Sequence, residues 1–217
     1  MISRARAVLV GGTFDPVHLG HIAVADQARR QLDAAEAWFI PSRRPPHRPP
    51  AVASAEDRLA MLRAVAESYP WLRVLDVEVV RPGPSYTLDT LRELARTHSD
   101  TEQWFLLGAD AAREIRSWHR LGELLETAHF VLVNREGVGE LTLDEAAALG
   151  FDPGRTRIIG VESPPISATE VRSRAAARQP LIQLVPEPVA RLIEARSLYR
   201  QSSDASGDNG HSPQEVG

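Results

Sequence analysis

Hydrophobic and polar positions follow two patterns that alternate along the chain. Short continuous apolar runs, such as residues 7–10, are typical of strands buried on both faces, whereas longer segments carry apolar residues at helical spacing. The patterns predict strands over residues 7–10, 37–40, 73–80, 103–107, 129–133 and 157–161. They predict helices over residues 22–32, 54–68, 87–96, 120–127, 168–177 and 186–195. This alternation indicates an α/β fold with a mostly parallel sheet, helices on both faces and two C-terminal helices.

Polar segments follow several of these strands. In a parallel sheet, ligands bind beyond the carboxyl ends of the strands. We therefore expect the chemistry of this protein in residues 11–21, 41–50, 108–118 and 163–172.

The first of these segments reads GGTFDPVHLGH and matches neither the dinucleotide-binding glycine pattern nor the P-loop. Gly11 and Gly12 allow backbone to approach a ligand closely, and His18 and His21 share one face near a helix N-terminus. Free N–H groups there favour an anion, and two imidazoles add donors for phosphate oxygens. Four interpretations remain open: a metal site, a catalytic pair, a phosphate-binding pair, and packing. A metal site would need a third ligand such as Asp15, and the spacing is that of no known zinc motif.

The second segment, PSRRPPHRPP, is proline-rich and basic. Its structural interpretation is an extended surface loop. Its functional interpretation is a flap over the sheet edge that carries positive charge toward a polyanionic substrate, on Arg43, Arg44, His47 and Arg48.

The segment PISATEVR also permits two interpretations. Ser167 and Glu170 fit the spacing of a capping box, which predicts a well-capped helix. Alternatively, Ser167, Thr169 and backbone N–H groups form an anion site to which Arg172 adds a charged fork. The second interpretation requires Glu170 to turn away from the anion.

Aromatic and acidic side chains follow the strand predicted over residues 103–107. Trp118 could stack on an aromatic base or cap the core. Asp110 could accept hydrogen bonds from ribose hydroxyls or cap the next helix.

Composition narrows the function classes. The 217 residues carry a formal net charge of −4, so no global basic field favours nucleic acid. The chain contains neither cysteine nor lysine, which excludes disulfides, a cysteine nucleophile and Schiff-base chemistry on lysine. No stretch is long and apolar enough to span a membrane, and we expect no signal peptide and a cytoplasmic location. The polar residues 201–217 are expected to form a disordered tail.

Taken together, these segments resemble one family. GGTFDPVHLGH resembles the GxFDPxHxGH signature of the nucleotidylyltransferase superfamily, and ISATEVR resembles its C-terminal partner motif ISSTxxR. Three further segments are similar to those of bacterial nicotinate-mononucleotide adenylyltransferases, namely IPSRRPPHR, SYTLDTL and LGADAAREIRSWHRLGELLETAHFVLVNR. The resemblance covers about residues 7–200, and it implies a Rossmann-like three-layer fold with one nucleotidylyltransferase domain over residues 1–200.

The resemblance also implies a reaction. The 5′-phosphate of nicotinate mononucleotide would attack the α-phosphorus of ATP, giving nicotinate adenine dinucleotide and pyrophosphate. Mg²⁺ would assist through the ATP phosphates, with no metal ligands on the protein. The partners would be these two small molecules, with neither nucleic acid nor membrane, and a homo-oligomer is compatible with the sequence.

Residue roles follow from the matched motifs. His18, His21 and Arg172 would stabilise the transition state. ATP would be bound by Gly12, Thr13, Phe14, His18, His21, Gly108, Asp110, Ser167, Thr169 and Arg172. Nicotinate mononucleotide would be bound by His47, Arg48, Thr87, Trp118 and His119, with Trp118 stacking on the ring and the His119 backbone N–H meeting the carboxylate.

The chain departs from the family pattern at three places. Ala168 replaces the second serine of ISST, residues 136–137 replace a Pro-Gly after Arg135, and His119 stands where an aromatic residue is usual. Two alternatives to the leading function remain. One is an adenylyltransferase of the same superfamily acting on nicotinamide mononucleotide or phosphopantetheine, and the other is a non-catalytic nucleotide-binding module.

Overall fold

The computed structural model describes residues 4–45, 49–135 and 139–200, and the expected tail at 201–217 lies outside them. Within these residues one six-stranded sheet is built from β1 (Ala5–Gly12), β2 (Glu36–Pro41), β3 (Leu72–Val74), β4 (Thr101–Gly108), β5 (His129–Arg135) and β6 (Thr156–Val161). The helices are α1 (Leu19–Gln31), α2 (Ala55–Ala66), α3 (Val77–Val80), α4 (Thr87–Thr97), α5 (Ala109–Arg113), α6 (Leu121–Thr127), α7 (Leu143–Ala148), α8 (Ala168–Ala176) and α9 (Glu187–Ala195). Two 3-10 turns are η1 (Ile115–Ser117) and η2 (Pro153–Arg155). None of the helices in this described part of the chain combines the length and apolar character needed to cross a membrane.

The strand order is β3-β2-β1-β4-β5-β6, and every neighbouring pair is parallel. The chain first builds the sheet outward from β1 to β3 and then returns to place β4 on the other side of β1. The point where the order reverses therefore lies between β1 and β4. In open parallel sheets, the crevice beyond the carboxyl ends of the strands at this point is where ligands bind.

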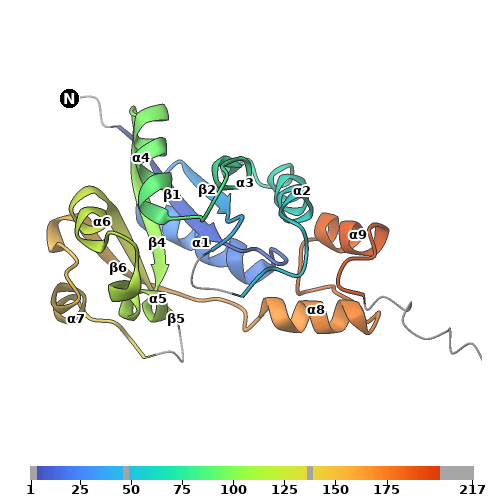
Figure 1. The fold of residues 1–217 in the computed structure, drawn as a ribbon. Helices are drawn as coiled ribbons and strands as arrows, with labels where there is room; N and C mark the ends of the chain where they lie inside the picture. The colour runs from blue at the N-terminus through green and yellow to red at the C-terminus, as the bar shows by residue number, and fades with distance from the viewer. Residues whose placement is uncertain (1–3, 46–48, 136–138, 201–217) are drawn as a thin grey trace, which may run out of the picture.

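Helices cover both faces of the sheet, as Figure 1 shows. Alternate residues of β1 face opposite sides: Val8 and Val10 join a core cluster with α1, α2, α8 and α9, whereas Ala7 and Leu9 join a cluster with α4, α5, α6 and α7. Burial on both sides explains why β1 is apolar without alternation. The expected Rossmann-like three-layer fold with a parallel sheet and C-terminal helices is confirmed.

One predicted strand is wrong in its extent. Residues 73–80 were expected to form a single strand, but β3 ends at Val74, and α3 begins at Val77. β3 is an edge strand with only three register pairs to β2. Beyond it, the Asp76 carbonyl accepts the N–H groups of Val79 and Val80 at 2.8 and 3.0 Å, which closes a helical turn.

Two short helices, α5 and α7, were not predicted. The sequence does carry a signal for α7, because Thr142 and Glu145 form a reciprocal capping box at its start. The helix expected over residues 54–68 is α2, and it is capped by Ser54, whose hydroxyl accepts the Asp57 N–H at 3.0 Å.

Candidate active site

The loop that follows β1 brings the first motif to the carboxyl edge of the sheet. Phe14 adopts a left-handed backbone conformation with φ of 50°, and its buried ring contacts Phe39 and His21 at centroid distances of 5.3 and 5.1 Å. A side chain at Gly12 would place its Cβ 3.1 Å from the Phe14 ring. The glycine therefore suits the close packing of the loop on itself at the carboxyl end of β1.

The two histidines of this motif lie together at the start of α1. Their rings stack at 3.7 Å with an interplanar angle of 27°. The His18 backbone N–H donates to His21 Nδ1 at 3.3 Å. Because Nδ1 of His21 accepts, the proton of its neutral ring is on Nε2, which makes Nε2–H a hydrogen-bond donor.

Both histidines are uncharged at neutral pH. Burial, with a smaller effect of the Arg135 charge, lowers the pKa of His18 to about 4. Burial also lowers the pKa of His21 well below its usual value, with further effects of His18 and Arg135. Each ring can therefore offer a neutral N–H donor but no positive charge.

The pKa of His18 leads to a prediction about acid stability. Lowering the pH from about 7 to about 4.5 should reduce the free energy of unfolding by about 2 kcal/mol more in the unmodified protein than in His18→Gln. The folded-state pKa is depressed, so this stability is present above the unfolded pKa of about 6.5 and is lost as the pH falls toward about 4. Urea denaturation of both proteins at both pH values measures the difference. An equal loss in the two proteins would contradict burial of an uncharged ring.

The expected donors at the start of α1 are only partly available. The Leu19 N–H donates to the Leu184 carbonyl at 2.9 Å. Fewer free donors are therefore left for an anion than the sequence suggested, because the N–H groups of His18, Leu19 and His21 are already satisfied within the protein.

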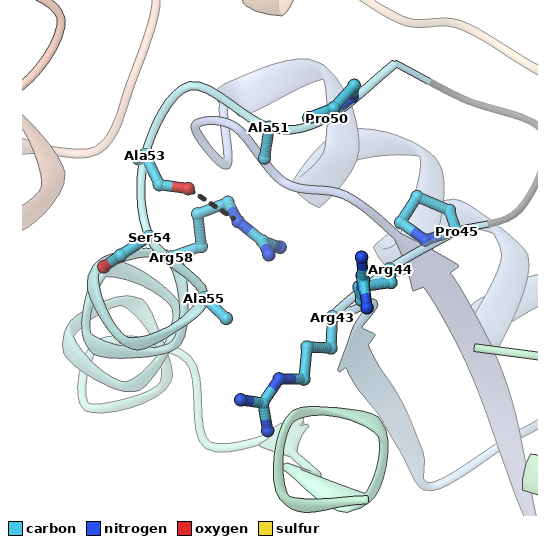
Figure 2. A pocket seen from close by; sticks show the side chains of 9 residues that line it. All are labelled: Arg43, Arg44, Pro45, Pro50, Ala51, Ala53, Ser54, Ala55 and Arg58. Carbon is cyan, nitrogen blue, oxygen red and sulfur yellow. Dashed lines mark hydrogen bonds between the residues drawn. The ribbon is translucent and has the colours of Figure 1, made fainter. Parts of the chain in front are cut away.

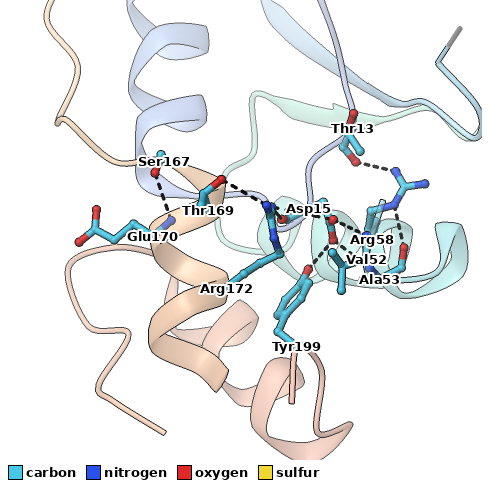
Figure 3. A network of polar contacts seen from close by, with 10 residues as sticks. All are labelled: Thr13, Asp15, Val52, Ala53, Arg58, Ser167, Thr169, Glu170, Arg172 and Tyr199. Atoms are coloured by element: carbon cyan, nitrogen blue, oxygen red, sulfur yellow. Dashed lines mark hydrogen bonds and ion pairs between the residues drawn. The ribbon is translucent and has the colours of Figure 1, made fainter. Parts of the chain in front are cut away.

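The start of α8 joins the β1 loop through Arg172, as Figure 3 shows. Its guanidinium donates to the Asp15 carbonyl at 2.8 Å and to the Thr169 hydroxyl at 3.2 Å. The hydroxyl of Ser167 accepts the Glu170 N–H at 3.1 Å, so the capping interpretation of Ser167 is confirmed. The Glu170 carboxylate bonds to Arg174 at 2.9 Å, one turn further along α8. It therefore turns away from the helix start, as an anion site there requires.

Asp15, weighed as a third metal ligand, has a different role. Its buried carboxylate accepts the Val52 and Ala53 N–H groups at 2.7 and 3.1 Å and the Tyr199 hydroxyl at 2.9 Å. Among the residues described, no group of three or more His, Asp or Glu side chains is arranged to hold a metal.

Arg58 is a further residue of this network that the sequence interpretation missed. It is 1% exposed and donates to the carbonyls of Ala53 and Thr13 at 3.3 and 2.5 Å. Its sequence signal is an arginine on the apolar stripe of α2, in line with Leu62 and Val65. Tyr199 carries no comparable signal, because it lies beyond the last helix.

A pocket of about 330 Å³ lies beside Arg58 (Figure 2). Its lining includes the side chains of Arg43, Arg44 and Arg58, and no acidic residue is among the described residues that line it. The Arg43 guanidinium donates to the Val79 carbonyl at 2.9 Å, and Ser85 Oγ accepts both the Arg43 and Arg44 N–H groups at 3.1 and 3.4 Å. His47 and Arg48 lie outside the described residues.

The end of β4 supplies the other side of the crevice. Gly108 is the N-cap of α5, and no neighbouring atom lies within 4 Å of the position where a Cβ would stand. The alternative in which Asp110 caps α5 is wrong, because Asp110 is inside the helix and its side chain is 80% exposed. Its carboxylate lies 3.7 Å from Arg113 and is open to a ligand.

The residues expected around the nicotinate ring come together through an aromatic contact. Thr87 is the first residue of α4, and Tyr86 before it stacks on His119 at 4.1 Å and 24°. Trp118, which precedes His119 in the chain, is half-buried, and its ring packs edge-on against Phe105 of β4 at a centroid distance of 6.2 Å. His119 thus keeps an aromatic contact despite the departure from the family pattern. Tyr86 was missed, although it precedes Thr87 in the same motif.

Comparisons with known proteins agree with this architecture. Residues 9–174 match the family model described as "Cytidylyltransferase-like". A relative in Acidothermus cellulolyticus is 40% identical over 205 residues, which cover 92% of this chain and 96% of the relative. A relative in Exiguobacterium sibiricum is 38% identical over 193 residues, covering 88% and 97%. Both are named "Probable nicotinate-nucleotide adenylyltransferase".

A solved structure shares the fold. Nicotinic acid mononucleotide adenylyltransferase of Plasmodium falciparum, complexed with NaAD, superposes with a TM-score of 0.74 at 19% identity. The match covers 90% of this chain and 97% of the other. At this identity the likeness shows the fold alone, whereas the relatives above show the family. The chain belongs to the cytidylyltransferase-like family and, within it, to the nicotinate-nucleotide adenylyltransferases.

Proposed function

We propose that this protein transfers the adenylyl group of ATP to nicotinate mononucleotide and that the crevice between β1 and β4 is its active site. The proposal rests above all on the bond from Arg172 to the Asp15 carbonyl, 157 positions away in sequence. This bond brings the cation of the C-terminal motif to the loop that carries His18 and His21. The family membership of the chain supports the same reaction.

In this reaction the attacking group is already ionised. An oxygen of the acceptor's 5′-phosphate forms a bond to the α-phosphorus of ATP, and the bond from that phosphorus to the oxygen bridging to the β-phosphate breaks, releasing pyrophosphate. No protein group needs to remove a proton, so positioned donors that stabilise spreading negative charge are sufficient. When ATP is bound, Mg²⁺ would be carried on its phosphates as part of the substrate and would neutralise part of their charge, with no protein ligand assigned to it.

The phosphate contacts would come from three sources. His18 and His21 donate through neutral N–H groups, a state consistent with the low pKa of both rings. Arg172 provides a permanent charge in fork geometry. Hydroxyls at the start of α8 and the backbone of residues 12–14 complete the ATP phosphate site, namely Ser167, Thr169, Gly12, Thr13 and Phe14.

The two nucleoside ends would lie at β4. Gly108 leaves room for the adenylate, and the exposed Asp110 carboxylate accepts ribose hydroxyls. Thr87 and Trp118 hold the nicotinate ring, and the His119 backbone N–H meets its carboxylate, with His47 and Arg48 contacting the mononucleotide.

An acceptor panel tests the proposal. ATP and Mg²⁺ are supplied with nicotinate mononucleotide, nicotinamide mononucleotide or phosphopantetheine, and pyrophosphate release is measured. The expected result is the highest kcat/KM with nicotinate mononucleotide. A preference for phosphopantetheine would overturn the acceptor assignment, and ATP binding without pyrophosphate release from any acceptor would favour a non-catalytic module.

The role of Trp118 leads to a separate prediction. Trp118→Ala should raise the KM for nicotinate mononucleotide by roughly 5- to 150-fold, which corresponds to about 1–3 kcal/mol of lost stacking. The KM for ATP should change little, because the ATP phosphates would be bound at α1 and α8. Initial-rate kinetics with each substrate varied in turn measure both constants. An increase confined to the KM for ATP would show that the nicotinate ring binds elsewhere.

A further inference from the structure

The C-terminal end of the chain packs onto the loop that we assign to ATP. Beyond α9, Arg196 forms an ion pair with Asp57 of α2 at 2.7 Å, and Tyr199 extends to Asp15. Tyr199 follows a left-handed turn at Ser197, with φ of 51°, and it packs against the same core cluster as α2 and α8. Figure 3 shows its hydroxyl directed at the Asp15 carboxylate.

Asp15 connects three segments that are far apart in sequence. Its side chain accepts the N–H groups of Val52 and Ala53, which precede α2, and the hydroxyl of Tyr199. Its main-chain carbonyl accepts Arg172 of α8. Any displacement of Asp15 therefore moves the anchor of the Arg172 guanidinium.

The Tyr199 hydroxyl is well suited to holding Asp15 in place. Burial, together with the charge of Asp15 and the hydrogen bond to it, raises the pKa of Tyr199 far above its ordinary value, so the hydroxyl keeps its proton. It donates to Oδ1, which it shares with the Ala53 N–H. A hydrogen bond to a buried carboxylate is among the stronger ones in proteins, and its loss leaves part of that charge unsatisfied.

We propose that Tyr199 is a positioning residue for adenylyl transfer: through Asp15 it fixes the loop at residues 13–16 against Arg172, so that the phosphate donors are aligned before substrate binds. This inference rests on the proposed function for its kinetic effect, but the coupling between Tyr199 and the Asp15 network does not depend on it. Small misplacements of such donors reduce turnover more than binding.

The kinetic test is the Tyr199→Phe variant, which retains the ring and removes the hydroxyl. We expect kcat to fall about tenfold, while the KM for nicotinate mononucleotide stays within about twofold. Tyr69→Phe is the matched control, since Tyr69 is a partly buried tyrosine of the same cluster whose ring packs on Trp71. Its kinetics should equal those of the unmodified protein. Unchanged kcat in Tyr199→Phe, or an equal loss in Tyr69→Phe, would overturn the inference.

A double-mutant cycle tests whether the effect passes through Asp15. In an Asp15→Ala background the acceptor of the Tyr199 hydroxyl is already lost, so adding Tyr199→Phe should lower kcat by less than about twofold further. A full multiplicative loss in the double variant would show that Tyr199 acts by another route and would overturn the inference.

Amide exchange provides a readout that is independent of activity. Val52 and Ala53 donate their N–H groups to Asp15, so their exchange should accelerate in Tyr199→Phe at a temperature where the global fold is intact. If the unmodified protein fails to transfer adenylate but this exchange changes, the proposed function fails and the coupling stands. If adenylate is transferred but neither exchange nor kcat changes, the role of Tyr199 fails and the proposed function stands.

Discussion

His18→Ala is expected to lower kcat by about two orders of magnitude, because it removes a donor placed where charge develops on the transferring phosphate. The variant also removes the ring that stacks on His21 at 3.7 Å. His18→Gln retains an N–H donor on a side chain of similar reach and should recover part of the loss. Steady-state assays with ATP and nicotinate mononucleotide both saturating measure kcat directly.

A matched control separates the loss of a hydrogen-bond donor from the loss of side-chain packing. His98 lies at the end of α4, where its ring packs on Trp38 at 4.7 Å. His98→Ala should leave kcat within about twofold, since removing its ring costs packing but no donor at the crevice. Turnover of His18→Ala equal to that of His98→Ala would rule out a role in charge stabilisation.

Arg172→Ala should lower kcat by about two to three orders of magnitude, as expected for loss of a charge-stabilising donor. The guanidinium carries a charge and also ties Thr169 to the Asp15 carbonyl. Arg172→Lys keeps the positive charge but not the forked geometry of the guanidinium. Its kcat should therefore reach only about a tenth of the value of the unmodified protein. Measurements of kcat and of both KM values define where the loss falls.

Arg191→Ala is the control for this experiment. Arg191 lies on the neighbouring helix α9, where its partner is Glu187, one turn earlier. An exposed pair of this kind contributes about 0.3–0.5 kcal/mol to a helix, so both stability and kcat should change little. If Arg191→Ala were as damaging as Arg172→Ala, the effect would reflect the loss of any helical ion pair and not a phosphate contact.

The fold was predictable because β1, β4 and β5 are buried on both faces, which leaves uninterrupted apolar runs in the sequence. The exception is residues 73–80, where an apolar sequence continues past a short edge strand into a helical turn. Apolar character alone does not distinguish a strand from a buried turn when the segment is short.

The candidate site was predictable only in part, for a related reason. Residues within motifs, such as His18 and Arg172, are marked by their spacing along the chain. Tyr199 acts across 184 positions through a single hydrogen bond, and no local pattern encodes such a contact. Asp15 was visible in its motif, but its other side-chain bonds are to backbone amides, which no side-chain pattern reveals.

The bond between Arg172 and Asp15 also has a consequence for synthesis of the protein. All six strands of the sheet are complete by Val161, so the ribosome has translated the whole sheet before it reaches the cation of the C-terminal motif. A chain released before residue 172 lacks this guanidinium altogether. Such prematurely terminated products would therefore lack the forked phosphate donor that we assign to adenylyl transfer, and we expect them to have little enzymatic activity.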